Sequence, residues 1–287
     1  MFWREIECLR DQRVNNTIIT VSHLAKHIIN YFGDGSSFGV TIEYFIEETP
    51  LDKAGVLYKL RYKLDNDFLL LNVDSIFDID FTCFVDYHKA KGEHVTLFPH
   101  PNSHPYGSGV LIADSDRSVE AWLTKEDVIP EWYRNRVNAG LHVINPTVVD
   151  MVDVDAERIG TEEENGKIIK VDLDHQILKP LCVTRKMFCY DSPEYVKDMG
   201  TPDRYETICA DYREGRVTAK TSRINKGSFF LIKMERSTSM LDSCEILMIL
   251  SFFPELQMLS GLSCNRRYLP ARNCTRRGYL RTVVRNP

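Results

Sequence analysis

The sequence lacks several features that mark specialised classes of protein. It has no CxxC pair among its eight cysteines and no internal repeat or low-complexity tract. No apolar run approaches the roughly 18 residues of a membrane span. The start, residues 1–13, also lacks a basic region followed by an apolar core. Because scattered cysteines without ligand-like spacing are typical of free thiols in a reducing compartment, we expect a cytoplasmic protein without a zinc site, an export signal or a membrane partner.

A basic excess is absent as well. Lys and Arg total 36 against 41 Asp and Glu, which gives a formal net charge of -5. We therefore expect no nucleic-acid partner, although small anionic ligands are compatible with this balance. With 287 residues, of which 43% are hydrophobic, the chain can bury a full core in one large domain or two small ones.

Strand-like and helix-like segments alternate through the first hundred residues. The strand-like runs are NTIITV, FGVTIEYFIEE, DFLLLNVD and HVTLFPH. Helical spacing occurs before the first run and recurs between the others, as in KAGVLYKLRYKL and DFTCFVDYHKAKG. This alternation predicts an α/β fold with a mostly parallel, doubly wound sheet. DFLLLNV is apolar on both faces, as a central strand requires.

The sequence pattern changes at about residue 107. GSGVLIADSDRSVEAWL predicts a small β-rich insertion, with two short strands about an Asp-Ser-Asp turn. RVNAGLHVINPTVVD predicts a strand and then a helix with Pro146 in its first turn. Further along, GTEEENGKIIKVDLDHQILKPL indicates an acidic loop and a helix, and Thr201 with Pro202 begins another helix.

Three aspartates lie close together after the central strand. Asp74 follows the strand directly, and ligands of open α/β sheets bind beyond the carboxyl ends of the strands. Asp78 and Asp80 are instead spaced like the start of the next helix, so we expect them to be caps. Asp74 is therefore the candidate site residue of the three.

Six segments, taken together in this order, carry a family resemblance over roughly residues 1–225. They are YFGDGSSFGVTIEYFIEETPLDKAG, LLLNVDSIFDIDF, LFPHPNSHPY, YRNRVNAGLHVINP, KVDLDHQILKPL and YDSPEYVKDMGTPDRY. The set resembles the sugar-1-phosphate nucleotidyltransferases, in particular the branch often fused to a HAD-type phosphatase and associated with mannose- or heptose-1-phosphate guanylyl transfer. The resemblance implies a Rossmann-like, GT-A-type fold. It also implies nucleotidyl transfer from a nucleoside triphosphate to a sugar 1-phosphate, giving an NDP-sugar and pyrophosphate.

The resemblance also implies site residues. Asp74 and Asp198 match the two metal aspartates of the family, which makes Mg²⁺ the expected cofactor because it prefers hard oxygen ligands. Either aspartate alone would be read as a cap or a solvated turn. Lys125 matches the catalytic lysine that meets the sugar phosphate, and the alternative for it is an ordinary surface lysine.

Two further segments match substrate-binding positions. Asn138, Ala139 and Gly140 match the segment that holds the sugar, although Gly140 is explained equally well as relief of packing within a strand. A second set matches the loop that approaches the nucleotide base, and a plain helix N-terminus explains its proline almost as well. That set is Pro50, Leu51, Ala54 and Gly55.

The sequence departs from the family pattern within these motifs. Asp52 and Lys53 replace the usual Gly-Thr, and Val73 replaces a small residue before Asp74. Each change is expected either to reduce the space in the nucleotide site or to alter its charge.

The two ends depart further. Residues 1–13 correspond to the helix that follows the family's Gly-rich GGxGTR loop, so we expect the first strand and the phosphate cradle to be absent and turnover to be impaired. From residue 226, where relatives enter the phosphatase domain, the chain has no clean periodicity. A one-base shift near residues 226–227 permits FDKDGTINKYVGFLRD, which contains the DxDGT signature of HAD phosphatases. We therefore expect a nucleotidyltransferase domain over 1–225 and an irregular, frameshifted tail over 226–287.

Two functions remain as hypotheses. The first is a sugar-1-phosphate nucleotidyltransferase, and the second is a catalytically inactive subunit that binds a sugar nucleotide or regulates a relative. The expected partners are a sugar 1-phosphate and a nucleoside triphosphate, and self-association into a homo-oligomer is left open.

Overall fold

The computed structural model describes residues 2–22, 25–102, 109–124, 126–128, 130–151, 155–163, 166–217, 247–251 and 283–285. The helices are α1 (Phe2–Asp11), α2 (Ala25–Phe32), α3 (Asp52–Leu60), α4 (Phe81–Lys91), α5 (Lys179–Leu181) and α6 (Pro202–Arg213). The strands of the first half are β1 (Asn16–Val21), β2 (Thr41–Ile46), β3 (Phe68–Asn72), β4 (Ser75–Asp78), β5 (Val95–His100), β6 (Val110–Ala113) and β7 (Val119–Leu123). Those of the second half are β8 (Trp132–Arg134), β9 (Val137–Ile144), β10 (Met187–Cys189), β11 (Tyr195–Asp198), β12 (Leu247–Ser251) and β13 (Val283–Arg285).

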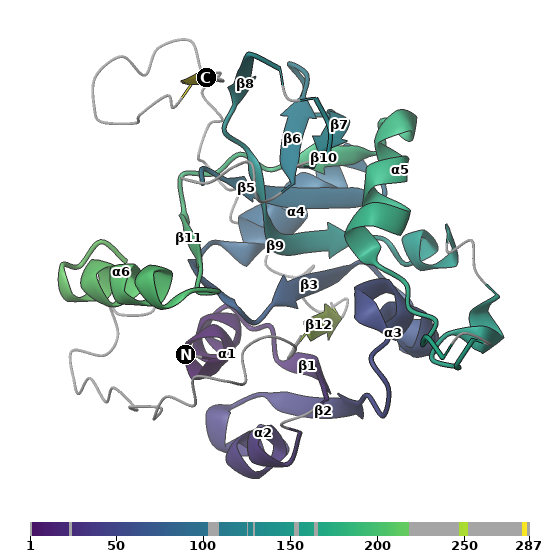
Figure 1. Cartoon of the computed structure of the whole chain (residues 1–287). Coiled ribbons are helices and arrows are strands. Elements are labelled where there is room, and N and C mark those ends of the chain that lie inside the picture. Colours follow the sequence, from purple (N-terminus) through teal and green to yellow (C-terminus); the bar gives the residue numbers. More distant parts are fainter. Residues whose placement is uncertain are drawn as a thin grey trace.

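The central sheet has the strand order β10-β5-β9-β3-β12-β1-β2 (Figure 1). The outer pairs β10–β5 and β1–β2 are parallel, whereas β9 is antiparallel to both β5 and β3. β12 is likewise antiparallel to both β3 and β1. Thus β10, β5, β3, β1 and β2 share one direction, which confirms the mostly parallel sheet.

Helices cover both faces of this sheet, as a doubly wound fold requires. Successive residues of β3 face opposite sides: Phe68 and Leu70 join one core cluster, and Leu69 and Leu71 join the other. The first cluster packs against α3 and residues 173–182, and the second against α1, α2 and α4 (Figure 1). β3 is therefore the central strand that its two-sided apolar pattern predicted.

Smaller β units flank the sheet and complete the site. β6 and β7 form the predicted hairpin, and β6 is attached to β9 through the pair Val110 and Val137. On the other side β11 pairs antiparallel with β4, so that Asp198 lies opposite Ser75. A short 3-10 helix, Pro146–Met151, stands where a helix beginning near Pro146 was predicted.

The aspartates before α4 divide into a cap and a strand residue. Asp80 is the N-cap of α4, and its side chain accepts a hydrogen bond from the Cys83 N–H, as predicted. The prediction that Asp78 is a cap is wrong, because the pairing of β4 with β11 extends to Asp78 opposite Tyr195. α6 begins as predicted, with Thr201 as its N-cap and Pro202 in its first turn.

Of the residues from 226 onward, the structure describes β12 and β13. β12 lies between β1 and β3 and pairs with both, and β13 pairs with β8. These two segments are strands within the predicted irregular tail, and the division of the chain at residue 226 stays a prediction. A physical reason for the pairing of β12 is that the gap between β1 and β3 presents unpaired N–H and C=O groups on both sides, which an extended segment can satisfy.

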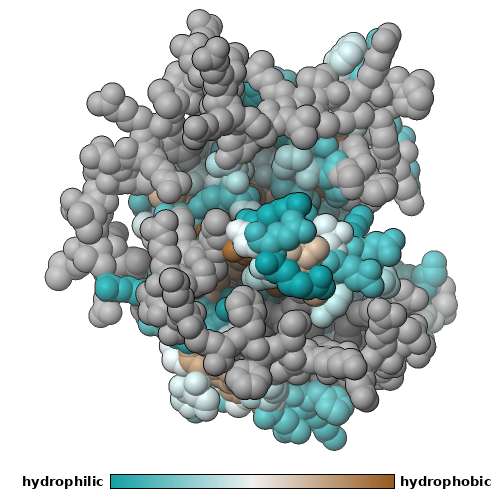
Figure 2. All heavy atoms as spheres, turned by 90° about the vertical axis from the view of Figure 1, so that its left-hand side faces the viewer, coloured by the Kyte–Doolittle hydropathy of each residue, from teal (hydrophilic) through white to brown (hydrophobic). Residues whose placement is uncertain are grey.

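The face that carries α6 is predominantly hydrophilic where the structure describes it, with only small apolar patches (Figure 2). No helix within the described part of the chain has the length and apolar character needed to cross a membrane.

Candidate active site

A cavity of about 500 Å³ opens at the carboxyl ends of β3 and β5 and beside β9. This volume is within the range of about 300–1,000 Å³ that is usual for small-molecule sites. The residues that line it come from segments spread between Asn72 and Asp198: Asn72, Asp74, Ser75, His100, Asn102, Gly109, Trp122, Thr124, Glu126, Asn138, Ala139, Gly140, Asp174, His175 and Asp198.

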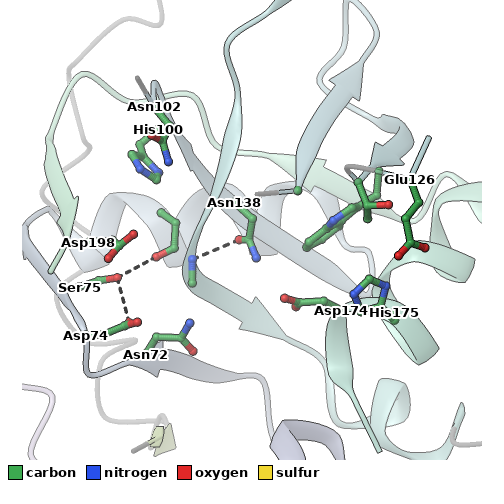
Figure 3. Close-up of a pocket in the computed structure, with 15 residues that line it drawn as sticks. Asn72, Asp74, Ser75, His100, Asn102, Glu126, Asn138, Asp174, His175 and Asp198 are labelled. Atoms are coloured by element: carbon green, nitrogen blue, oxygen red, sulfur yellow. Dashed lines mark hydrogen bonds between the residues drawn. The ribbon is translucent and has the colours of Figure 1, made fainter. Parts of the chain in front are cut away.

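One end of the cavity holds Asp74, Ser75 and Asp198 (Figure 3). Asp74 is in the turn between β3 and β4, and the β4–β11 pairing brings Asp198 beside it. The Met199 N–H also donates to the Asp74 carbonyl oxygen at 2.7 Å. Burial, followed by the negative charge of Asp198, raises the pKa of Asp74. Two aspartates far apart in sequence thus line the same end of the cavity, and a cation would relieve their repulsion.

Asp198 also has partners on α6. Arg204 forms an ion pair with its Oδ2, and the Gly200 N–H donates to its Oδ1 at 2.5 Å. His100 lies near this end of the cavity as well. Burial lowers the pKa of His100, and the charge of Asp198 acts in the opposite direction.

The other end of the cavity holds Glu126, Asp174 and His175 (Figure 3). Burial raises the pKa of Asp174, and the positive charge of Lys53 opposes that rise. Lys53 Nζ lies 3.9 Å from Asp174 Oδ2, while Oδ1 is buried and has no hydrogen-bond partner among the described residues. A buried acceptor of this kind fits a ligand that brings a hydrogen-bond donor, such as a hydroxyl group.

The middle of the cavity is formed by Asn138, Ala139 and Gly140 of β9 with Asn72 of β3 (Figure 3). Gly140 has a φ of 72°, and a Cβ added there would lie 2.4 Å from Asn72 Nδ2. Backbone conformation and the close approach of Asn72 therefore both require glycine. The Ser75 hydroxyl donates to the Ala139 carbonyl at 3.2 Å, which ties β9 to the turn that carries Asp74.

No lysine or arginine lines the cavity in the part of the chain that the structure describes, whereas four carboxylates do. An anionic ligand therefore needs a cation beside it. The described residues contain no group of three or more His, Cys, Asp or Glu side chains placed to hold a metal. Asp74 and Asp198 nevertheless fit hydrated Mg²⁺, which often takes one or two protein carboxylates and leaves its other positions to water and phosphate.

Some of the predicted site residues line the cavity and others do not. Asp74, Asp198 and the segment from Asn138 to Gly140 meet in the cavity, and Lys125 lies outside the described residues. The predicted base-contacting residues do not line this cavity: Leu51, Ala54 and Gly55 are buried, and Pro50 is exposed. The amides of Ala54 and Gly55 donate to the Val171 carbonyl at 3.0 and 3.2 Å. Their role at the nucleotide base stays a prediction.

Several lining residues were not predicted. Asn72 and His100 end β3 and β5, and the general rule for strand ends that pointed to Asp74 applies to them equally. Asp174 and His175 lie within KVDLDHQILKPL, a segment that carried the resemblance, and no role had been given to either. Only the folded chain shows that Asp174 Oδ1 is buried without a partner.

A sequence model of the Nucleotidyl transferase family matches residues 1–215. The mannose-1-phosphate guanyltransferase of Debaryomyces hansenii is 28% identical over 208 residues, which are 70% of this chain and 53% of that protein. The mannose-1-phosphate guanylyltransferase of Mycobacterium tuberculosis is 30% identical over 215 residues, 75% of this chain and 56% of that protein. The chain thus spans about half the length of these relatives.

Solved structures have the same fold. HddC from Yersinia pseudotuberculosis superposes with a TM-score of 0.58 at 18% identity and covers 73% of this chain and 84% of its own. A putative glucose-1-phosphate thymidylyltransferase from Bacillus anthracis, in complex with a sucrose, has a TM-score of 0.58 at 16% identity and covers 79% of this chain and 84% of its own.

Proposed function

Because the chain belongs to the nucleotidyl transferase family, we propose that its cavity holds a sugar 1-phosphate beside a nucleoside triphosphate and supports nucleotidyl transfer between them. The observation that carries the proposal is that one cavity contains two kinds of polar group. The carboxylates of Asp74 and Asp198 lie at one end, and the polar side chains of Asn138 and Asp174, which can bind sugar hydroxyls, lie further along. The mannose-1-phosphate guanylyltransferases among the relatives support a mannose-type sugar phosphate and guanine as the first choices to test.

The reaction needs little covalent chemistry from the protein. An oxygen of the sugar phosphate forms a bond to the α-phosphorus of the nucleoside triphosphate, and the bond from that phosphorus to pyrophosphate breaks with its electron pair. The attacking oxygen belongs to a phosphate that is already ionised at neutral pH, because its second pKa is about 6. No side-chain base is therefore required, and the side chains act by positioning and by matching charge.

Each end of the cavity has its own task. Asp74 and Asp198 would hold Mg²⁺, which would neutralise phosphate charge in a cavity lined by four carboxylates. Asp174 Oδ1 accepts a hydrogen bond from a sugar hydroxyl, which gives that buried oxygen a partner. Arg204, which does not line the cavity, forms an ion pair with Asp198 and so holds that carboxylate in place.

The test measures pyrophosphate release and ligand binding separately. The purified chain is mixed with Mg²⁺, mannose 1-phosphate or a heptose 1-phosphate, and each nucleoside triphosphate in turn. We expect only slow pyrophosphate release, because turnover is expected to be impaired. Asp74→Asn should abolish this release, and Asp65→Asn, a change at an exposed position outside the cavity, should preserve it. Calorimetric binding of the sugar phosphate without pyrophosphate release would favour the alternative, a binding or regulatory subunit. Absence of both would overturn the proposal.

A further inference from the structure

The amide of Asn138 is held from one side by two donors on its own strand. β9 is irregular between Asn138 and His142, because its pairing with β5 shifts register between Leu97 and Pro99 and Gly140 has a φ of 72°. Gly140 has no side chain between the other two, and His142 Nε2 comes within 2.9 Å of Asn138 Oδ1. The Gly140 N–H donates to the same Oδ1 at 3.2 Å.

These two contacts fix the orientation of the amide and the tautomer of the imidazole. A backbone N–H can only donate, so the side-chain atom of Asn138 that faces Gly140 is the oxygen. An oxygen of an amide can only accept, so His142 Nε2 carries the proton. His142 Nδ1 is then the unprotonated nitrogen, and it is buried without a hydrogen-bond partner among the described residues.

The surroundings of His142 keep this arrangement fixed. The side chain is fully buried, between Leu70 of β3 and Leu97 of β5 in the sheet register. Burial, with the nearby charge of Lys53, lowers the pKa of His142 to about 3. The ring is therefore neutral throughout the physiological pH range, and its hydrogen bond to Asn138 sets which nitrogen carries the proton.

We infer that His142 is a positioning residue that locks the Asn138 amide with its oxygen inward and its NH₂ group toward the cavity, so that the site offers hydrogen-bond donors to an acceptor oxygen of the bound sugar phosphate. The identity of that ligand rests on the proposed function, whereas the lock itself rests on the contacts within β9. The cavity then distinguishes its two polar positions: Asn138 donates, and Asp174 accepts.

Matched substitutions of His142 test the lock by function. Gln places an amide nitrogen near the position of Nε2 and keeps the donor, whereas Phe keeps the ring and removes it. We expect His142→Phe to weaken binding of mannose 1-phosphate about tenfold by calorimetry, since losing one ordered hydrogen bond worth about 1.4 kcal/mol changes an affinity tenfold. His142→Gln should stay within about threefold of the parent chain. Manganese binding at Asp74 and Asp198, followed by electron paramagnetic resonance, should be the same in all three proteins.

The outcomes separate positioning from general damage. Equal loss in His142→Phe and His142→Gln, loss of manganese binding together with sugar-phosphate binding, or unchanged affinity in His142→Phe would each overturn the inference.

A second measurement does not depend on any ligand or variant. Nitrogen-15 NMR of the histidine-labelled parent chain should show His142 as a neutral ring with the proton on Nε2 between about pH 5 and 8. A proton on Nδ1, or a charged ring at pH 6, would refute the lock. If the parent chain binds neither mannose 1-phosphate nor a heptose 1-phosphate, the proposed function fails while this spectrum still decides the inference.

Discussion

Gly140 lines the cavity and also has a backbone conformation that favours glycine. Its φ of 72° disfavours any L side chain, and its Cα faces Asn72 so closely that a methyl group would collide. We expect Gly140→Ala to lower the free energy of unfolding by more than the roughly 1–2 kcal/mol that left-handed backbone alone costs. Chemical denaturation measures the difference.

Gly92→Ala is the matched control for this prediction. Gly92 also has a positive φ, of 66°, but a Cβ there meets nothing within 4 Å. It therefore reports the backbone cost without the collision. Equal losses of stability in the two variants would contradict the steric part of the argument.

Asp74 should make the stability of the domain depend on pH. Burial and Asp198 raise its pKa in the folded state, so the folded chain binds this proton more tightly than the unfolded chain. The stabilising contribution is complete below the ordinary pKa of an aspartate and is lost as the pH rises through the raised value. We expect Asp74→Asn to be more stable than the parent chain at pH 7 and equally stable in acid, by urea denaturation at several pH values between about 4 and 8. A parent chain less stable in acid than Asp74→Asn would contradict this sign.

At the residue level, sequence motifs pointed to some residues that line the cavity and to others that do not, and they gave no sign of contacts made only in the fold. Asp74 and Asp198 were found because each belongs to a recognisable segment, and the structure brings both to the cavity. Nothing in the sequence fixes that Asp174 Oδ1 lacks a partner or that His142 reaches Asn138 across a glycine. Those facts depend on how distant segments pack in the folded chain, which no local pattern encodes.

At the scale of elements, Asp80 caps the start of α4, where Gln12 Oε1 also accepts the Phe81 N–H. Asp80 Oδ1 accepts the Cys83 N–H at 3.1 Å, which satisfies one of the backbone donors that the first turn leaves without a partner. We expect Asp80→Ala to lower the free energy of unfolding by about 1 kcal/mol and Asp80→Asn to cost little, because asparagine caps as well as aspartate. Thermal unfolding of the two variants provides the comparison, and equal destabilisation by both would argue against a capping role.

Element types were read from the sequence more successfully than their ends. The two-sided apolar run of β3 and the alternating hairpin of β6 and β7 carry strong local patterns, and both were predicted. Asp78 was mistaken for a cap because its inclusion in β4 depends on β11, which is far away in the sequence. A helix signal and a strand pairing compete at that position, and the long-range pairing prevails.

For the whole molecule, the order of the central strands links the sheet to the site. β9 and β12 run against the other central strands, on either side of β3. β3 carries Asn72 and leads directly into the turn of Asp74, so its position between two neighbours holds one wall of the cavity. Weaker pairing of β3 with β9 or β12 should therefore also alter the cavity wall that β3 forms.

This dependence can be tested at β12. Ile249 pairs with Ile18 of β1 and with Leu70 of β3, and proline at 249 removes a backbone donor from the interior of a sheet. In Ile249→Pro we expect amide hydrogen exchange to accelerate in β1 and β3, since an unpaired edge exposes their backbone groups. Exchange in β5 and β10, which pair with each other away from β12, should change least and provides an internal reference. Unchanged protection of β1 and β3 in the variant would mean that their stability does not depend on β12.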